Sequence, residues 1–179
     1  KVHKHLMKNE EYFMFKVFHD HLKISQIKEL LEFRLNKIII LKRRPIDMFI
    51  SLCKAQKLKQ FSQVNTTDIE IEIDSNKFLN YHIKLKKQFQ TYKKLSLKHT
   101  DQINLIDYDE FAGFTEDETY HILKNKLCSA GINLNPDFNN SSQFFKQDKE
   151  FCYSSKVLNW KSFFNDLTKK NSLSKLNSF

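Results

Sequence analysis

The distribution of apolar residues along the chain predicts strands that alternate with helices. Two short apolar runs, KIIIL (37–41) and INLIDY (103–108), are typical of strands buried in a parallel sheet. The segment EYFMFKVFH (11–19) is aromatic and apolar without a helical period, and DIEIEID (68–74) alternates strictly, like a strand with one face in water. The pattern therefore predicts strands at these four places.

Between and after these strands, apolar residues recur at helical spacing. Thr115 and Glu118 have the spacing of a capping box, which marks the start of a helix. Gly131 is suited to the left-handed residue that follows a helix end. The predicted helices cover 25–35, Asp47 to about Phe61, Ser75 to about His99, Thr115 to Gly131, and a final segment from about Trp160.

This alternation of elements indicates the fold class. Strands separated by helices are joined by crossover connections, and consecutive strands then run parallel. We therefore expect an α/β fold with a mostly parallel sheet flanked by helices. A length of 179 residues suffices for one domain with its own core, so we expect a single domain over residues 1–179.

Composition narrows the possible partners and locations. The formal net charge of +9 suits an anionic partner, which could be a nucleic acid, an anionic surface or an anionic small molecule. The three cysteines lie far apart without a CxxC pair, so we expect reduced thiols. No apolar run is long enough to span a membrane, and the first residues contain no apolar signal region. We expect a cytoplasmic protein without a membrane segment.

The chain leaves the predicted strand 37–41 through two arginines and a proline. In an open parallel sheet, ligands bind beyond the carboxyl ends of the strands, where helix N-termini offer N–H groups to an anion. Arg43 would add a bidentate cation, and Asp47 as the N-cap would place the Ser51 hydroxyl one turn inside the helix. Local physics leaves a second interpretation open, in which the arginines are solvated residues at a strand end.

The segment RRPIDMFIS resembles the 3′-phosphate motif of sulfotransferases that use 3′-phosphoadenosine 5′-phosphosulfate. In that family the pattern reads R-x-P-x-D-x-x-x-S after an apolar strand, and Arg43, Pro45, Asp47 and Ser51 occupy the matching positions. The resemblance implies that Arg43 and Ser51 hold the 3′-phosphate of the nucleotide. Arg44 stands where the family often has Asn or Asp, so no direct contact is assigned to it.

Four further segments resemble the family. YFMFKVFH is similar to the strand whose Lys and His face the transferred sulfuryl group, and INLIDYDEF is similar to the strand that ends in Tyr-Glu-Asp-Leu. LCSAGINL resembles a helix end of the family, and SSKVLNWKSFF resembles the C-terminal segment that closes over the nucleotide.

These segments imply roles for individual residues. Sulfuryl transfer needs a cation for the charge that grows on the bridging oxygen, and a base for the proton of the acceptor hydroxyl. The resemblance implies that Lys16 supplies the charge and His19 takes the proton, with His21 as the local rival of His19. The residues implied to bind the nucleotide in addition are Ser155, Lys156 and Trp160. The acceptor would carry a hydroxyl group, and its class stays open.

The resemblance also implies a P-loop nucleotide-kinase-like sulfotransferase fold that lacks its first strand, loop and helix. The phosphosulfate loop of the family, rich in Gly, Ser or Thr, would precede residue 11. The two glycines of this chain, Gly113 and Gly131, lie far downstream, and the chain begins with Lys instead of Met. We therefore expect an N-terminally incomplete sequence that binds the nucleotide but transfers sulfate poorly.

Two other functions stay open at this level. A non-catalytic nucleotide-binding relative would account for the missing loop. A basic nucleic-acid-binding domain would need cations gathered on one face with exposed aromatic residues among them, whereas the lysines here are spread over every element, so we expect no nucleic-acid partner. The pairs His3–His5 and His19–His21 have no Cys or carboxylate at ligand spacing, so no metal site is expected.

Overall fold

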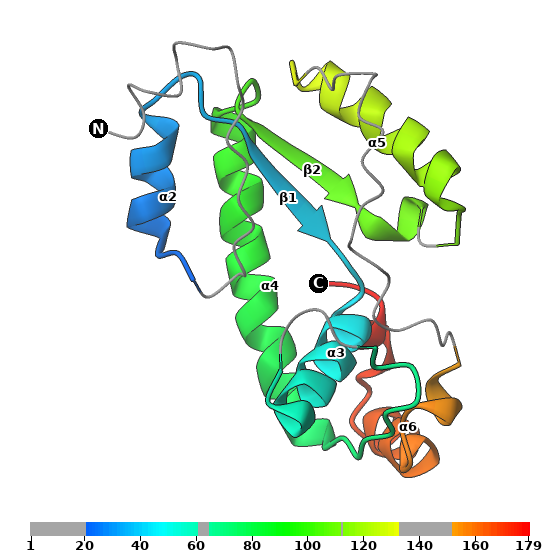
Figure 1. Ribbon diagram of the computed structural model, residues 1–179. Coiled ribbons are helices and arrows are strands. Elements are labelled where there is room, and N and C mark those ends of the chain that lie inside the picture. Colours follow the sequence, from blue (N-terminus) through cyan, green and yellow to red (C-terminus); the bar gives the residue numbers. More distant parts are fainter. Residues whose placement is uncertain (1–20, 61–64, 112, 133–151) are drawn as a thin grey trace. The chain divides into compact units, whose positions relative to one another are not determined.

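The computed structural model describes residues 21–60, 65–111, 113–132 and 152–179 (Figure 1). The chain divides into two compact units, Lys1–Asn36 and Lys37–Phe179. The predicted strand 11–19 lies outside the described residues. The expectation of a single domain over residues 1–179 stays a prediction.

The described part of the first unit contains one helix, α2, which covers Ile24–Leu31. Its buried side chains are Ile27 and Leu31, as the helical period predicts. The prediction that the helix continues to residue 35 is wrong, and Leu35 is 66% exposed. The side-chain amide of Asn36 donates to the carbonyl oxygen of Leu30 at 2.8 Å. This bond satisfies a carbonyl group of the last turn, for which the helix itself provides no N–H donor.

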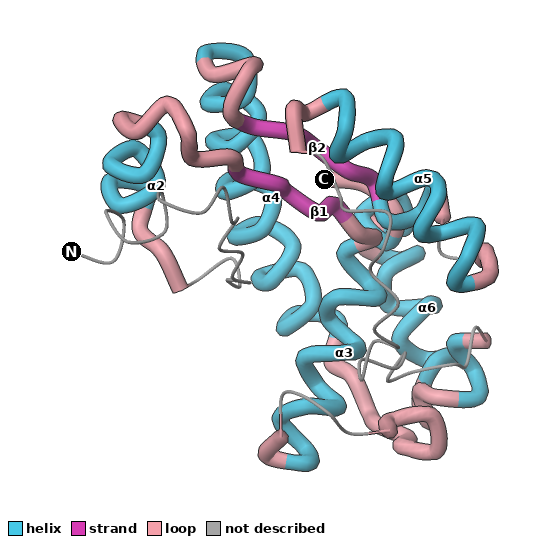
Figure 2. Tube along the Cα trace, turned by 45° about the horizontal axis from the view of Figure 1, so that its top comes forward, coloured by secondary structure: helices cyan, strands magenta, loops and turns pink. Residues whose placement is uncertain are grey.

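The described residues of the second unit form two parallel strands, β1 (Ile38–Lys42) and β2 (Ile103–Asp107). Ile38 lies opposite Ile103, and the register continues to Lys42 opposite Asp107. Figure 2 shows the two strands side by side among the helices. The prediction of a mixed α/β architecture with parallel pairing is confirmed at this level, with a two-stranded sheet in the described residues.

Both strands are less buried than their apolar sequences predict. Ile38 to Ile40 are half-buried, and Leu41 is 48% exposed. In β2, Ile103 and Ile106 are buried, whereas Leu105 is 40% exposed. A continuous apolar run is typical of a strand that is covered on both faces and paired on both edges. Within the described residues each strand pairs only with the other, so this expectation is wrong for Leu41 and Leu105.

Helix α3 covers Pro45–Leu58 and begins directly after β1. Its first residue is a proline, which has the right φ for a helix and lacks an N–H that would be unpaired there. Arg44 is therefore the N-cap, with φ −58° and ψ 134°. The prediction that Asp47 caps this helix is wrong, because Asp47 lies inside the first turn.

Helix α4 covers Ser75–Lys98, close to the predicted limits. The side chain of Asp74 accepts a hydrogen bond from the N–H of Lys77 at 2.7 Å and so caps the helix. One face of α4 buries Phe78, Leu85 and Leu95. The apolar period of the sequence therefore predicts this helix and its buried face correctly.

The segment 68–74 is extended but forms no strand. Its alternation does predict burial, because Ile71 and Ile73 are buried while Glu70, Glu72 and Asp74 are exposed. Ile71 forms a single parallel bridge with Val157. The N–H and C=O of Ile73 bond to the side-chain amide of Asn159 at 3.0 and 2.8 Å. The strand prediction is wrong because the partner segment turns into helix α6 (Trp160–Lys169) after one bridge.

Helix α5 (Glu116–Ser129) begins at the predicted capping box. The side chain of Thr115 accepts from the N–H of Glu118, and the side chain of Glu118 accepts from the N–H of Thr115 at 2.8 Å. The helix ends in a Schellman motif, in which the N–H of Ile132 donates to the carbonyl of Leu127. Gly131 has a φ of 74° in this motif, which glycine adopts without strain.

The hydrophobic core of the second unit joins α3, α4 and α6. Phe78 of α4 contacts Phe49 of α3 and Phe163 of α6 edge to face, at ring distances of 5.5 and 5.7 Å. The described residues of this unit also form three short 3-10 helices: η1 (Tyr108–Glu110), η2 (Tyr153–Ser155) and η3 (Leu173–Leu176). Among the described residues, no helix is both long and apolar enough to cross a bilayer.

Candidate functional site

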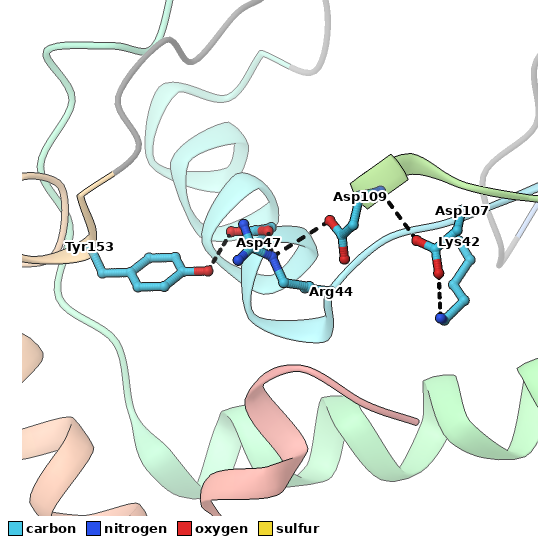
Figure 3. A network of polar contacts seen from close by, with 6 residues as sticks. All are labelled: Lys42, Arg44, Asp47, Asp107, Asp109 and Tyr153. Carbon is cyan, nitrogen blue, oxygen red and sulfur yellow. Dashed lines mark hydrogen bonds and ion pairs between the residues drawn. The ribbon is translucent and has the colours of Figure 1, made fainter. Parts of the chain in front are cut away.

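Three elements of the second unit converge at the carboxyl ends of the two parallel strands. β1 runs through Arg43 into helix α3, β2 runs into η1, and η2 reaches the same place from the C-terminal part of the chain. Figure 3 shows the polar contacts that join them. Arg44 contacts Asp47 of α3 at 2.8 Å and Asp109 of η1 at 3.6 Å. This ion-pair network fixes the start of α3 against the end of β2.

Tyr153 of η2 extends the network toward the C-terminal helix. Its hydroxyl donates to the carboxylate of Asp47 at 2.9 Å, and its ring stacks on Trp160 of α6 at 4.7 Å. Burial raises the pKa of Tyr153, and the negative charge of Asp47 raises it further. Tyr153 is therefore a hydrogen-bond donor at any physiological pH, and it links Trp160 of α6 to the first turn of α3.

Arg43 differs from its neighbour Arg44 in its contacts. Its guanidinium lies over the ring of Tyr108, 4.6 Å from the ring centroid. Its Nε is buried and has no hydrogen-bond partner, and Arg43 forms no ion pair with another described residue. A guanidinium is planar and presents its donors as a fork, which matches the geometry of a phosphate or carboxylate. Arg43 is therefore a cation that contacts an aromatic ring and forms no ion pair with another described residue.

The charges around Arg43 are neutralised in pairs. Lys42 contacts Asp107 at 2.5 Å, across the last register position of the sheet. Burial opposes ionisation of Asp107, but the hydrogen bonds from Lys42 and from the N–H of Asp109, together with the charges of Lys42 and Lys126, outweigh it, so the pKa of Asp107 is lowered. Burial raises the pKa of Asp109, and Arg44 opposes this effect without overcoming it.

The start of α3 adds donors to this site. The first N–H groups of a helix have no acceptor inside the helix, and Pro45 has no N–H. Arg44 makes no side-chain cap to the helix. The carboxylate of Asp47 in the first turn would repel an anion, but it is already engaged by Arg44 and Tyr153. The positive end of the helix macrodipole therefore adds to the charge of Arg43.

The structure places the predicted nucleotide-binding residues as follows. Arg43 is at the exit of β1, and Ser51 is exposed on α3. Trp160 is partly buried against Tyr153, and Ser155 is exposed at the end of η2. Lys156 is only 7% exposed, and its ammonium lies 5.2 Å from the centroid of the Tyr153 ring. A direct contact of this ammonium with a nucleotide would require its side chain to turn outward.

The structure does not describe the predicted catalytic residues. Lys16 and His19 lie outside the described residues, so their roles stay predictions. His21 belongs to the described part of the first unit and is exposed.

Sequence reasoning missed the aromatic partners of the site. Tyr108, whose ring contacts the guanidinium of Arg43, directly follows the apolar strand. A polar residue at the carboxyl end of a parallel strand is a general signal for a ligand site. Tyr153 directly precedes the segment SSKVLNWKSFF, and no sequence pattern marks it as a site residue. Its bond to Asp47 joins residues 106 positions apart, and no local pattern contains that information.

A pocket of about 320 Å³ lies beside the network, between the end of the sheet and helix α4. Apolar and charged side chains line this pocket, and Lys42 and Asp107 are among them. The lining residues are Lys42, Phe89, Lys93, Leu105, Ile106, Asp107 and Glu110. Within the described residues, no three His, Cys, Asp or Glu side chains are grouped closely enough to hold a metal ion.

Comparison with protein-family models, with curated proteins and with solved structures finds no match to this chain.

Proposed function

We propose that this chain binds 3′-phosphoadenosine 5′-phosphosulfate and is a sulfotransferase that moves the sulfuryl group to a hydroxyl acceptor. The finer fold that follows from this proposal is the P-loop nucleotide-kinase-like sulfotransferase fold. The observation that carries the proposal is the state of Arg43, which is oriented on Tyr108 with a buried, unpartnered Nε. Its neighbour Arg44 is paired with two carboxylates.

In this proposal the 3′-phosphate occupies the exit of β1. Arg43 supplies a bidentate, charge-assisted contact, and Ser51 donates from the exposed side of α3. The first N–H groups of α3 provide further donors to the same anion. The stacked pair Tyr153 and Trp160, which hydrogen-bonds to the first turn of α3 through Asp47, offers an aromatic wall for the adenine base.

The proposed reaction breaks the bond between sulfur and the bridging oxygen of the donor and forms a bond from sulfur to the acceptor oxygen. The proton of the acceptor hydroxyl passes to His19, and Lys16 neutralises the charge on the leaving phosphate oxygen. The products are a sulfate ester and 3′-phosphoadenosine 5′-phosphate. Alignment and charge neutralisation are the main contributions that a protein makes to such a loose transfer.

The second candidate is a nucleotide-binding protein without transfer activity. Both candidates require the same nucleotide site. They differ in whether a hydroxyl acceptor becomes sulfated.

Isothermal titration calorimetry tests the site, and a transfer assay separates the two candidates. We expect 3′-phosphoadenosine 5′-phosphate to bind more tightly than AMP, because only the former carries the 3′-phosphate. Equal affinity for the two nucleotides would refute the proposed site. Sulfate transfer from the donor nucleotide to a panel of sugars, alcohols and phenols would then identify an enzyme, whereas binding without transfer would identify the second candidate.

A further inference from the structure

Helix α4 has an unusual distribution of charge that the proposed nucleotide site does not use. Its 24 residues include seven lysines and no Asp or Glu, although acidic and basic residues alternate in many exposed helices. All seven lysines are exposed. Two pairs, Lys84–Lys87 and Lys94–Lys98, are three or four positions apart and repel each other on the helix surface, so an anionic partner would stabilise α4.

The lysines flank a line of residues on the exposed side of α4. Residues 83, 90 and 97 are seven positions apart and therefore lie almost along one line of the helix. Ile83 is 60% exposed and Leu97 is 72% exposed, which are high values for large aliphatic side chains. The lysines three or four positions away lie on both sides of this line. We call this surface the lysine face of α4, and it consists of Ile83, Lys86, Lys87, Gln90, Lys93, Lys94 and Leu97.

In the described part of the chain, no acid forms an ion pair with a lysine of this face. Among the described residues, the ion pairs lie at the ends of the sheet, where Lys42 binds Asp107, Arg44 binds Asp47 and Asp109, and Lys126 binds Glu110. None of the four lysines of the face takes part in them. From residue 83 to residue 97 the face is about 21 Å long, since each helical residue rises by about 1.5 Å.

We propose that the lysine face of α4 docks on a membrane surface that contains anionic lipids. Lysines near such a surface are attracted by its negative potential, and they need no fixed bidentate geometry. Ile83 and Leu97, between the lysines, are placed to enter the boundary between headgroups and acyl chains. The opposite side of α4 packs on the core through Phe78, Leu85 and Leu95, so docking requires no unfolding of the helix.

A nucleic acid fits this face less well than a membrane. Binding of single strands relies on exposed aromatic side chains on which bases stack, and contacts to phosphates and bases favour arginine. The face contains neither residue type. The aromatic residues of α4 are buried or half-buried on its other side: Phe78, Tyr81, Phe89 and Tyr92.

Vesicle co-sedimentation tests this proposal on the full chain. We expect binding to vesicles of phosphatidylcholine mixed with phosphatidylserine, and little binding to phosphatidylcholine alone. The double variant Lys87→Gln/Lys94→Gln should weaken binding about 25-fold, since each lysine near an anionic surface contributes about fivefold. Glutamine has nearly the helix propensity of lysine, and unchanged circular dichroism verifies that α4 is intact.

A charge-matched control distinguishes this face from the general basicity of the chain. Lys161 and Lys169 are exposed on α6, and Lys161→Gln/Lys169→Gln should change vesicle binding by less than about threefold. Ile83→Ser/Leu97→Ser should also weaken binding, and this loss should persist in high salt because it is apolar. Equal losses for the two lysine variants would overturn the proposal. Binding to duplex DNA without binding to the anionic vesicles would overturn it as well.

Discussion

At the scale of single residues, two side chains make important contacts at places where a strand or an isolated strand bridge ends. Asn159 bonds with its amide to both backbone groups of Ile73, and so replaces the next rung that a strand would provide. The ring of Tyr108 contacts the guanidinium of Arg43 at a place where a carboxylate often pairs with an arginine. In both cases the side chain fixes backbone or charge at the place where a regular element ends.

The contact of Asn159 gives a residue-scale prediction. Replacement by alanine leaves the N–H and C=O of the buried residue Ile73 without partners, so Asn159→Ala should lower the free energy of unfolding by about 1–3 kcal/mol. Urea denaturation followed by circular dichroism measures this change. The matched control is Asn165→Ala, at an exposed position of α6, which should change stability by less than about 0.5 kcal/mol. Similar values for the two variants would mean that the Asn159 bonds contribute nothing.

At the scale of elements, the C-terminal residues are held to helix α4 through a buried histidine. The Nε2 of His82 donates to the carbonyl oxygen of Ser178 at 2.7 Å, and Phe179 stacks over both His82 and Phe89. Because a carbonyl only accepts, the neutral imidazole carries its proton on Nε2. The Nδ1 of His82 is buried without a partner, so a second proton would have no acceptor.

This contact predicts how stability depends on pH. Burial lowers the pKa of His82, and the nearby charges of Lys175 and Lys86 lower it further, against the opposing bond to Ser178. A histidine whose pKa is lowered by folding stabilises the protein fully above its unfolded pKa of about 6.5. That contribution is lost as the pH falls through the folded pKa. The free energy of unfolding should therefore decrease as the pH falls below about 6.5.

Urea denaturation at a series of pH values measures this effect by difference. His82→Gln keeps an N–H donor for Ser178 but does not titrate, so its stability should depend less on pH than that of the unchanged protein. His121 is exposed on α5, and His121→Gln serves as the control that retains the dependence. If His82→Gln and the unchanged protein lose stability in parallel as the pH falls, His82 is not the titrating group.

At the scale of the whole molecule, the sequence predicts secondary-structure elements better than it predicts which segments pair with each other. Helix α4 follows from its apolar period and helix α5 from the capping box at Thr115, because these signals are local. The alternation in 68–74 predicts which side chains are buried, but strand formation depends on a partner that bends away at Asn159. The same limit applies to the site. The strand-to-helix turn at Arg43 is local, whereas Tyr108 and Tyr153 reach it from distant parts of the chain.

The central claim is that Arg43 is the specific ligand of a nucleotide 3′-phosphate. The measurement that tests it most directly is the ratio of affinities for 3′-phosphoadenosine 5′-phosphate and AMP, determined by calorimetry for the unchanged protein and its arginine variants. Arg43→Ala should reduce this ratio about 30-fold, corresponding to about 2 kcal/mol for a lost charge-assisted contact to phosphate.

Arg44→Ala should reduce the affinity ratio less, because Arg44 is already paired with Asp47 and Asp109. Arg34→Ala, at an exposed position of the first unit, controls for the loss of one charge. A ratio that is unchanged in Arg43→Ala, or reduced equally by all three substitutions, would contradict the account.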